Sequence, residues 1–374
     1  MKHDNIPVAT VVTDHHEQQH HHSLPSAPPL EPPPPPAAPR ESSGVLKGKL
    51  VVLGMPEGIA EQFVASSETF AVRYFIVDNS GSMCTDDGHR VVSSAGRTGM
   101  VSCSRWEEIG CSLSWLSKVA NALKAYTEFR LLNAPANGSP QVVRVGLSDV
   151  SEKQQEDAVE AMVNSPPCGK TPLCAAIREV VRDLSSRRED LRRAGKRACV
   201  VIASDGEASD GDVADALRPL RDLPCWVVVR LCTDADKVVE YWNSVDEQLE
   251  LDLDVIDDLT GEAKEVHAHA PYLAYGLALH RLREFGTTNK LIDLLDERPL
   301  SQHEILDLVA LILGSTAKDQ LPHPQLDWKH FLKDLGRLQS LVPEVWDPIH
   351  NKKKPWFDLR KLSRALGPPN CNIM

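Results

Sequence analysis

The stretch Tyr74-Phe75-Ile76-Val77-Asp78-Asn79-Ser80-Gly81-Ser82 changes character at its middle. Its first four residues are mostly apolar, which predicts a short buried strand. One carboxylate and two hydroxyls then follow at alternate positions, Asp78, Ser80 and Ser82. A loop at the carboxyl end of a parallel strand is where open α/β sheets bind their ligands. Oxygen donors alone suit Mg²⁺, Ca²⁺ or Mn²⁺ better than Zn²⁺, although the same residues are also ordinary turn formers.

Two later segments add oxygen donors to those of this metal loop, residues 78–82. In Gly169-Lys170-Thr171-Pro172-Leu173 a hydroxyl comes just before an expected helix. Pro172 suits the first turn of that helix, so Thr171 falls at its N-cap, where the hydroxyl either caps the helix or faces a cation. The stretch Val200-Val201-Ile202-Ala203-Ser204-Asp205-Gly206 is a second apolar strand, and it ends in the carboxylate of Asp205.

These three segments, in this order, resemble the metal-ion-dependent adhesion site of the von Willebrand factor A family. The resemblance covers about residues 47–270 and all five side-chain positions of the site. It implies that Ser80 and Ser82 bind a cation directly, Mg²⁺ or else Mn²⁺ or Ca²⁺. It also implies that Asp78, Thr171 and Asp205 complete the inner and outer shells. The last coordination position is then left for an acidic residue of a protein partner.

The remaining pattern predicts an α/β fold, because strand and helix signals alternate along the chain. We expect a doubly wound, mostly parallel sheet with helices on both faces, and one antiparallel edge strand formed by the hairpin of 129–132 and 142–147. Lys47 and Lys49 alternate with apolar residues, which favours a first strand at 45–53. The other expected strands lie at 70–77, 198–203, 226–231 and 251–256, and helices at 106–123, 156–163, 212–223 and 237–249, with one more after Pro172.

Several polar segments are interpreted as solvated. Residues 84–104 are rich in Gly, Ser and Asp and are expected to form a loop over or beside the metal; Asp86, Asp87 and His89 could reach the cation from there, but a solvated loop is favoured. Glu207, Asp210 and Asp212 are expected to be solvated or to cap helices. The run of acidic residues near the last strand matches no cation loop and is expected to form a solvated face; it consists of Asp252, Asp254, Asp257 and Asp258.

The length of 374 residues allows two or three domains. Residues 1–44 hold ten of the 27 prolines and six of the 14 histidines, so we expect a disordered tail there. Residues 45–270 form the von Willebrand factor A-like domain by the resemblance. Residues 271–374 are expected to form a helical region, with helical stretches in 282–313 and 328–341 and with its tryptophans in the packing.

Charge and cysteine content narrow the class of protein. The net charge of -12 disfavours nonspecific binding to nucleic acid, whose phosphates attract basic faces. The nine cysteines form no Cys-x-x-Cys pair, which favours reduced thiols in the cytoplasm. Three of them, Cys84, Cys168 and Cys174, flank the expected metal loops, where they have a redox role or serve packing alone.

Membrane association is expected to be weak at most. No apolar run is long enough to span a bilayer, and the first residues lack the pattern of a signal peptide. The last four residues, Cys371-Asn372-Ile373-Met374, fit a prenylation box except for the unusual Asn372. A single prenyl chain on Cys371, aided by the lysines at 352–354, predicts reversible peripheral attachment to a membrane.

The leading functional hypothesis is a cation-dependent protein-binding module, an adaptor or scaffold without enzymatic activity. One alternative is a metal-dependent hydrolase or phosphatase that uses the same cation to activate water, with His89 or Glu207 as the base. The sequence offers no Gly-x-x-x-x-Gly-Lys phosphate loop in its support. The other alternative is a scaffold whose metal site is idle and which binds through its C-terminal helices or its proline-rich tail.

Overall fold

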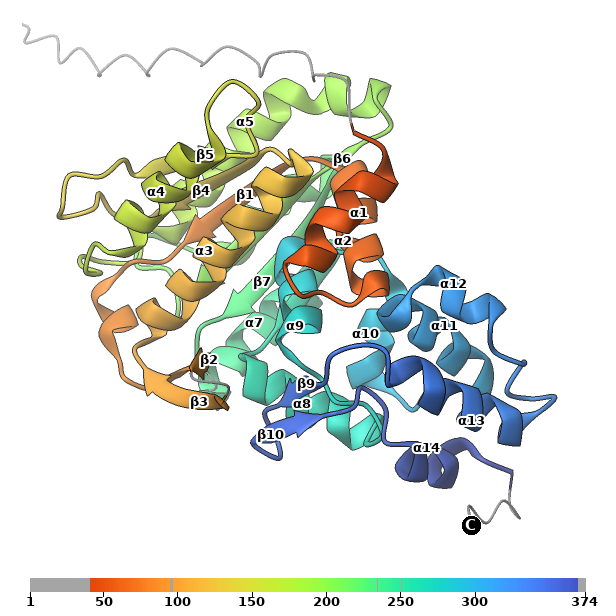
Figure 1. Cartoon of the computed structure of the whole chain (residues 1–374). Coiled ribbons are helices and arrows are strands. Elements are labelled where there is room, and N and C mark those ends of the chain that lie inside the picture. The colour runs from red at the N-terminus through yellow and green to blue at the C-terminus, as the bar shows by residue number, and fades with distance from the viewer. Residues whose placement is uncertain (1–40, 95–96, 234, 250, 369–374) are drawn as a thin grey trace, which may run out of the picture. The chain divides into compact units, whose positions relative to one another are not determined.

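Six strands form one sheet in the order β5-β4-β1-β6-β7-β8 (Figure 1). The computed structural model describes residues 41–368 except 95–96, 234 and 250. β5 pairs antiparallel with β4, whereas the other neighbours pair parallel. The predicted mixed α/β fold with one antiparallel edge strand is therefore confirmed. The strands are β1 Phe70–Val77, β4 Thr127–Leu131, β5 Val142–Val145, β6 Arg197–Ser204, β7 Cys225–Leu231 and β8 Leu253–Ile256.

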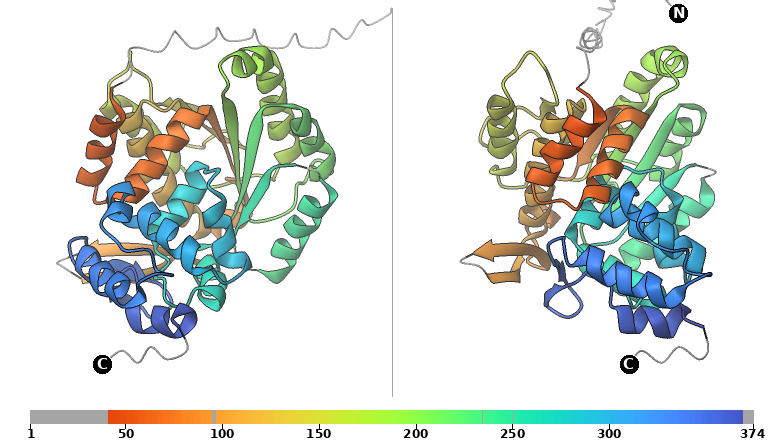
Figure 2. Two further views of the ribbon diagram at one scale, coloured as in Figure 1. Left: turned by 90° about the vertical axis from the view of Figure 1, so that its right-hand side faces the viewer. Right: turned by 45° about the vertical axis from the view of Figure 1, so that its right-hand side comes forward.

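Side chains of the central strand alternate between two hydrophobic cores. Phe75 and Val77 belong to one core, and Tyr74 and Ile76 belong to the other, because successive residues of a strand point to opposite faces. Both faces are thus covered, as a parallel sheet requires. Figure 2 (left) shows the helices of the red and blue segments on one side of the sheet and those of the green segment on the other.

The helices follow the same division. The core that contains Phe75 is completed by α1 Ser43–Val52, α2 Glu57–Thr69, α3 Arg105–Leu123, α4 Glu152–Val163, α8 Leu259–His269 and most of the C-terminal helices. The opposite core is completed by α5 Leu173–Arg193, α6 Val213–Leu217, the 3₁₀ helix Arg218–Asp222 and α7 Asp236–Gln248.

The first predicted strand, at 45–53, is wrong: this segment belongs to helix α1. Leu46 and Leu50 lie one helical turn apart and are both buried, so the apolar period is that of a helix. Lys47, whose position suggested the alternation of a strand, forms ion pairs with α2 instead. Its Nζ lies 2.5 Å from a carboxylate oxygen of Glu57 and 3.1 Å from one of Glu61. In so short a segment the spacing of apolar residues does not distinguish a helix from a strand, which is why a strand was predicted.

The loop expected at 84–104 is also corrected. It contains an antiparallel hairpin of β2 Gly88–Ser94 and β3 Arg97–Cys103. Val91 pairs across the hairpin with Met100, and both pack against the core that contains Phe75. Such apolar cross-strand pairs stabilise a hairpin, and they outweigh the Gly, Ser and Asp content that suggested a loop.

The C-terminal region is mainly helical, as predicted, but it also contains a short hairpin of β9 Val345–Asp347 and β10 Lys352–Lys354. Trp328 and Trp356 are buried in the packing, as expected. Side chains of the C-terminal helices share one core with those of the sheet. These helices are α9 Leu277–Phe285, α10 Lys290–Glu297, α11 Gln302–Leu313, α12 Ser315–Asp319, α13 Trp328–Gln339 and α14 Leu359–Leu366.

Three sequence predictions concern segments at or beyond the limits of these residues. The tail expected at 1–44 lies outside the described residues as far as Arg40, and Ser43 and Gly44 already belong to α1. The prenylation box at Cys371 also lies outside them, and the domain boundary at 270 stays a prediction. No helix in the described part of the chain has both the length and the apolar character to cross a membrane.

Candidate metal centre

The metal loop lies at the carboxyl end of β1, beside the end of β6. The backbone N–H of Asp78 donates to the carbonyl of Ala203 at 2.8 Å, which extends the β1–β6 ladder by one residue. The chain leaves β1 toward β4 on one side, whereas β6 lies on its other side. This is the point where the strand order reverses, and open α/β sheets bind ligands at that point.

Asp78 is a buried carboxylate, with 0% of its surface exposed. One oxygen accepts the backbone N–H of Ser80 at 2.8 Å, and the other accepts the hydroxyl of Ser204 at 2.8 Å. Burial raises the pKa of Asp78. The ion pairs found among the described residues give it no basic partner, although buried charges in proteins are normally paired or bound to a metal.

Ser80, Ser82 and Asp205 form a chain of hydrogen bonds beside Asp78. The two serine Oγ atoms are 3.0 Å apart, and the Ser82 hydroxyl donates to Asp205 Oδ1 at 2.9 Å. Ser80 and Asp205 are buried, whereas Ser82 is exposed. Four of the five predicted ligands therefore lie together, and the exposed serine opens this group of oxygens to solvent.

Thr171, the fifth predicted ligand, lies on the 166–171 loop. This loop is joined to the metal loop by two backbone hydrogen bonds, from Cys168 N–H to Asn79 O at 2.7 Å and from Gly81 N–H to Gly169 O at 3.2 Å. The Thr171 carbonyl accepts the N–H of Ser209 at 2.8 Å, so the loop also contacts the segment that follows Asp205.

The N-cap of α5 differs from the prediction. Pro172 occupies that position, and it has no side chain that could accept a backbone N–H of the helix. The carboxylate of Asp210 takes this role from the loop after β6, since it accepts the N–H groups of Cys174 at 3.0 Å and Ala175 at 2.8 Å. Thr171 is half-buried; its carbonyl accepts the N–H of Leu173 at 2.8 Å, whereas its hydroxyl makes none of the side-chain hydrogen bonds found among the described residues. Its hydroxyl is therefore not needed by the helix.

Asn79 and Asn133 hold the loops together, and the sequence analysis missed both. The Asn79 amide accepts the backbone N–H of Asn133 at 2.8 Å and donates to its carbonyl at 2.9 Å. The Asn133 amide in turn donates to the carbonyl of Lys170 at 2.8 Å. Gly169 has φ +85°, and a Cβ there would lie 2.7 Å from the Asn133 Oδ1. Only glycine fits this close approach between the loops.

Arg105, the first residue of α3, is a third residue of the site that was not predicted from the sequence. Its guanidinium donates to Asp205 Oδ2 at 2.7 Å and holds Asp87 by two hydrogen bonds of 2.7 and 2.5 Å. This pairing lowers the pKa of Asp87 and raises that of Arg105. Asp87 is therefore not a purely solvated side chain, and the ion pairs link the hairpin to the centre.

The other polar residues singled out near the loops divide into caps and exposed side chains. Asp212 accepts the N–H of Asp215 at the start of α6, and Asp210 caps α5, as the capping prediction requires. His89 and Glu207, the bases of the hydrolase alternative, are exposed.

The residues of the centre fit a hard divalent cation. The five predicted ligands offer only carboxylate and hydroxyl oxygens, which is the donor set of Mg²⁺ or Mn²⁺. Asp78 supplies a buried negative charge that no basic side chain among the described ion pairs neutralises. A cation bound there would be held by Ser80 and Ser82 and supported by Asp78, Thr171 and Asp205.

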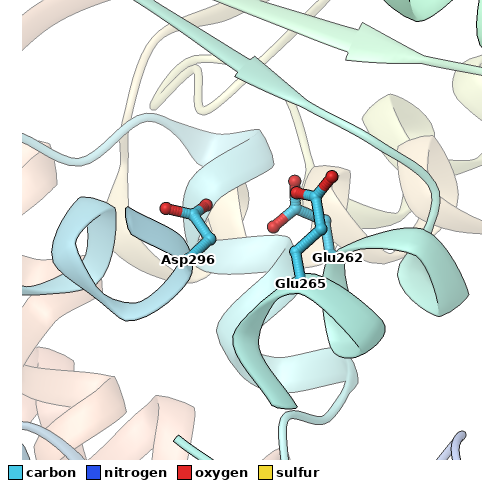
Figure 3. Close-up of side chains that lie close together, drawn as sticks. All are labelled: Glu262, Glu265 and Asp296. Carbon is cyan, nitrogen blue, oxygen red and sulfur yellow. The ribbon is translucent and has the colours of Figure 1, made fainter. Parts of the chain in front are cut away.

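A second group of carboxylates, Glu262, Glu265 and Asp296, lies outside these loops (Figure 3). One oxygen of each lies within 4.8 Å of the others. The guanidinium of Arg283 donates to Glu262 and, at 2.9 Å, to Asp296, and it also donates to Asp254 at 2.8 Å. Since an arginine already pairs with two of these three carboxylates, the group does not require a metal ion.

The acidic residues near the last strand do not all form the solvated face that was predicted. Asp254 is buried against Arg283, and Asp258 is buried at the N-cap of α8, where it accepts the N–H groups of Thr260 and Gly261. Among the described residues Asp252 fits the prediction better, since it is exposed and pairs with Arg197 at 2.6 Å.

Glu262 is expected to make stability depend on pH. Burial raises the pKa of Glu262 from 4.5 to about 8; the neighbouring carboxylates of Asp296 and Asp254 add to this rise, and Arg283 opposes it. An acid whose folded pKa is raised stabilises the fold below its unfolded pKa, and this stabilisation is lost as the pH rises through the folded value. Between pH 5 and 8 the unfolding free energy of the parent should fall relative to that of Glu262→Gln in urea titrations. Parallel pH profiles would contradict the shift.

The fold and the loops together define a doubly wound α/β protein with an oxygen-donor centre at the topological switch point. No protein-family model matches the chain, and no curated protein matches its sequence. Among solved structures it is similar to a mutant of the PilB minor pilin from Streptococcus sanguinis, with 12% identity, a TM-score of 0.38, and coverage of 61% of this chain and 62% of the pilin. It is also similar to the SpRpn10 VWA domain, with 13% identity, a TM-score of 0.31, and coverage of 50% of this chain and 88% of that domain. This chain thus spans less than two thirds of the length of the pilin, and both scores are low.

Proposed function

We propose that this protein is a divalent-cation-dependent protein-binding module, in which Mg²⁺ held by the loop residues coordinates a carboxylate of a partner. The ligands would be Ser80 and Ser82, supported by Asp78, Thr171 and Asp205. The observation that carries the proposal is the buried carboxylate of Asp78. It is fully buried and has no basic partner among the described ion pairs, and a bound cation would supply the missing positive charge.

The charge balance of the site favours an acidic partner. Its five residues include only two carboxylates, and Arg105 already holds one oxygen of Asp205. A dication with so few anionic ligands stays electrophilic, so an incoming carboxylate gains strongly from coordination. The exposed side chain of Ser82 leaves one side of the centre open to such a group.

Titration calorimetry of the full chain with Mg²⁺ and Mn²⁺ tests the cation site. The parent should show saturable binding, and Ser82→Ala should weaken it by about tenfold or more, roughly 1.4 kcal/mol, because one direct ligand is lost. Ser244→Ala is the matched control, since this exposed serine of α7 bonds only within its own helix. A parent that shows no saturable binding of either ion would refute the site.

Capture of partners on the immobilised chain separates the proposal from the idle-site alternative. Proteins bound in Mg²⁺ should be released by a chelator and should not bind Ser82→Ala. Partners that stay bound in the chelator would instead point to the C-terminal helices as the binding surface.

A further inference from the structure

Two exposed thiols lie on the loops that form the candidate metal centre. Of the eight cysteines that the structure describes, Cys84 and Cys168 are exposed, Cys111 is half-buried, and the others are buried. Burial raises the pKa of the buried thiols, for example to about 12 for Cys199, so they stay protonated and unreactive. The exposed pair is therefore where oxidants reach the described part of the chain most readily.

The Cys84 thiol lies close to the backbone just before Cys168. Cys84 ends the short 3₁₀ helix Gly81–Cys84, and its Sγ lies 3.9 Å from the carbonyl oxygen of Pro167. That carbonyl belongs to the peptide unit that leads into Cys168. Standard backbone dimensions then put the Cys84 Sγ within about 7 Å of the Cys168 Cα. A disulfide brings the two sulfur atoms to about 2.05 Å and the two Cβ atoms to about 3.5 to 4.5 Å, so forming one here requires rotation of both side chains and a shift of the two loops toward each other.

The two loops are already held in register. Cys168 N–H bonds to Asn79 O, and Gly81 N–H bonds to Gly169 O. The Asn133 side chain adds a hydrogen bond to the carbonyl of Lys170, on the same loop. Because these bonds fix one loop against the other, the thiols meet as an intramolecular pair with a high effective concentration.

We infer that Cys84 and Cys168 form a reversible disulfide that responds to low-molecular-weight disulfides such as oxidised glutathione. One cysteine thiolate attacks a sulfur of the reagent, and the first glutathione thiol leaves. The second cysteine thiolate then attacks the mixed disulfide, and the second glutathione thiol leaves. Two electrons pass from the protein to the reagent, and the two protein protons end on the released thiols.

The bridge would act on the cation site, a consequence that rests on the proposed function. Ser82 lies two residues before Cys84, and Thr171 lies three residues after Cys168. Forming the S–S bond draws the 3₁₀ helix toward the 166–171 loop, which moves both ligands away from the arrangement that Ser82 shares with Ser80 and Asp205. The oxidised chain should therefore bind Mn²⁺ more weakly, by about fivefold or more.

Peptide mapping tests the bond itself. The full chain is incubated with oxidised glutathione, blocked with N-ethylmaleimide and digested with trypsin, which yields peptides 74–90 and 154–170 with one cysteine each. A linked pair of these peptides is expected in the parent and in the control Cys111→Ser. In Cys84→Ser the mixed disulfide should remain on Cys168. Uptake of glutathione by that variant, without any linked peptide in the parent, would overturn the inference.

Mn²⁺ titration of the oxidised and reduced chains tests the consequence separately. Weaker binding that recovers on reduction, and that Cys84→Ser does not show, supports control of the centre by the thiol pair. Equal binding by both forms overturns that control. If the reduced chain binds no Mn²⁺, the proposed function fails, while the linked peptide still decides whether the disulfide exists.

Discussion

Replacing Arg283 by methionine is expected to lower the free energy of unfolding by about 3 to 5 kcal/mol, the cost of removing one partner from a buried ion pair. The guanidinium is buried and bonds to carboxylates from three elements, Asp254 of β8, Glu262 of α8 and Asp296 of α10. Methionine fills much of the volume of the arginine side chain. The decrease in the free energy of unfolding therefore comes from the unpaired carboxylates rather than from a cavity. Urea titration at pH 7 measures it.

A surface pair gives the matched control for Arg283. Lys318 lies 2.5 Å from Asp307, but both side chains are more than a third exposed. Lys318→Met should therefore change the unfolding free energy by only about 0 to 1 kcal/mol. Adding Asp254→Asn to Arg283→Met should recover part of the loss, because this buried carboxylate, 2.8 Å from the guanidinium in the parent, is then replaced by a neutral amide. A loss below about 1 kcal/mol for Arg283→Met would show that the carboxylates take up protons at little cost.

The sequence predicts the centre of this fold well because its strands carry strong local signals. Continuous apolar runs mark β1, β6 and β7, and each oxygen donor of the metal loop follows its strand directly. Parallel strands bring their carboxyl ends to one edge of the sheet, which explains why Asp78 and Asp205, far apart in the chain, were expected to lie together.

The connections between distant residues could not be predicted in the same way. Arg105 bonds to Asp205 across 100 positions, and Asn79 pairs with Asn133 across 54. Neither pair has a local pattern, since an arginine at a helix start and an asparagine in a turn are both common. The hairpin at 88–103 was missed for a related reason: its stability comes from Val91 and Met100 packing on a core that lies elsewhere in the sequence.

Helix α3 shows how these long-range contacts position the candidate site. Arg105 in its first turn bonds to Asp205 of the centre, and Glu108 one turn on pairs with the buried Arg230 of β7. Arg230 also bonds to Glu284 of α9 at 3.2 Å. The start of α3 is thus fixed to the sheet and to the C-terminal helices, so Asp205 is held by a rigid element rather than by its loop alone.

The effect of Asp78→Asn on the free energy of unfolding is expected to change sign when a cation is added. Without metal, the variant should be more stable than the parent by about 1 kcal/mol, because a neutral amide avoids a buried charge without a basic partner. The asparagine keeps an acceptor for the N–H of Ser80 and can donate to the Ser204 hydroxyl. With Mg²⁺ at 100 times its dissociation constant, the parent should gain about 2.7 kcal/mol and the variant nothing.

Urea titrations with Mg²⁺ and with chelator measure both halves of this reversal. Asp212→Asn is the matched control: it lies in the acidic segment after β6 but caps α6, and asparagine caps a helix about as well as aspartate. The free energies of unfolding of this control, in Mg²⁺ and in chelator, should therefore stay near those of the parent. A variant that loses stability in chelator as well as in Mg²⁺ would mean that Asp78 serves the fold of the loop. A residue that costs stability until a cation arrives is instead kept for binding, because the fold alone gives no reason to bury its charge.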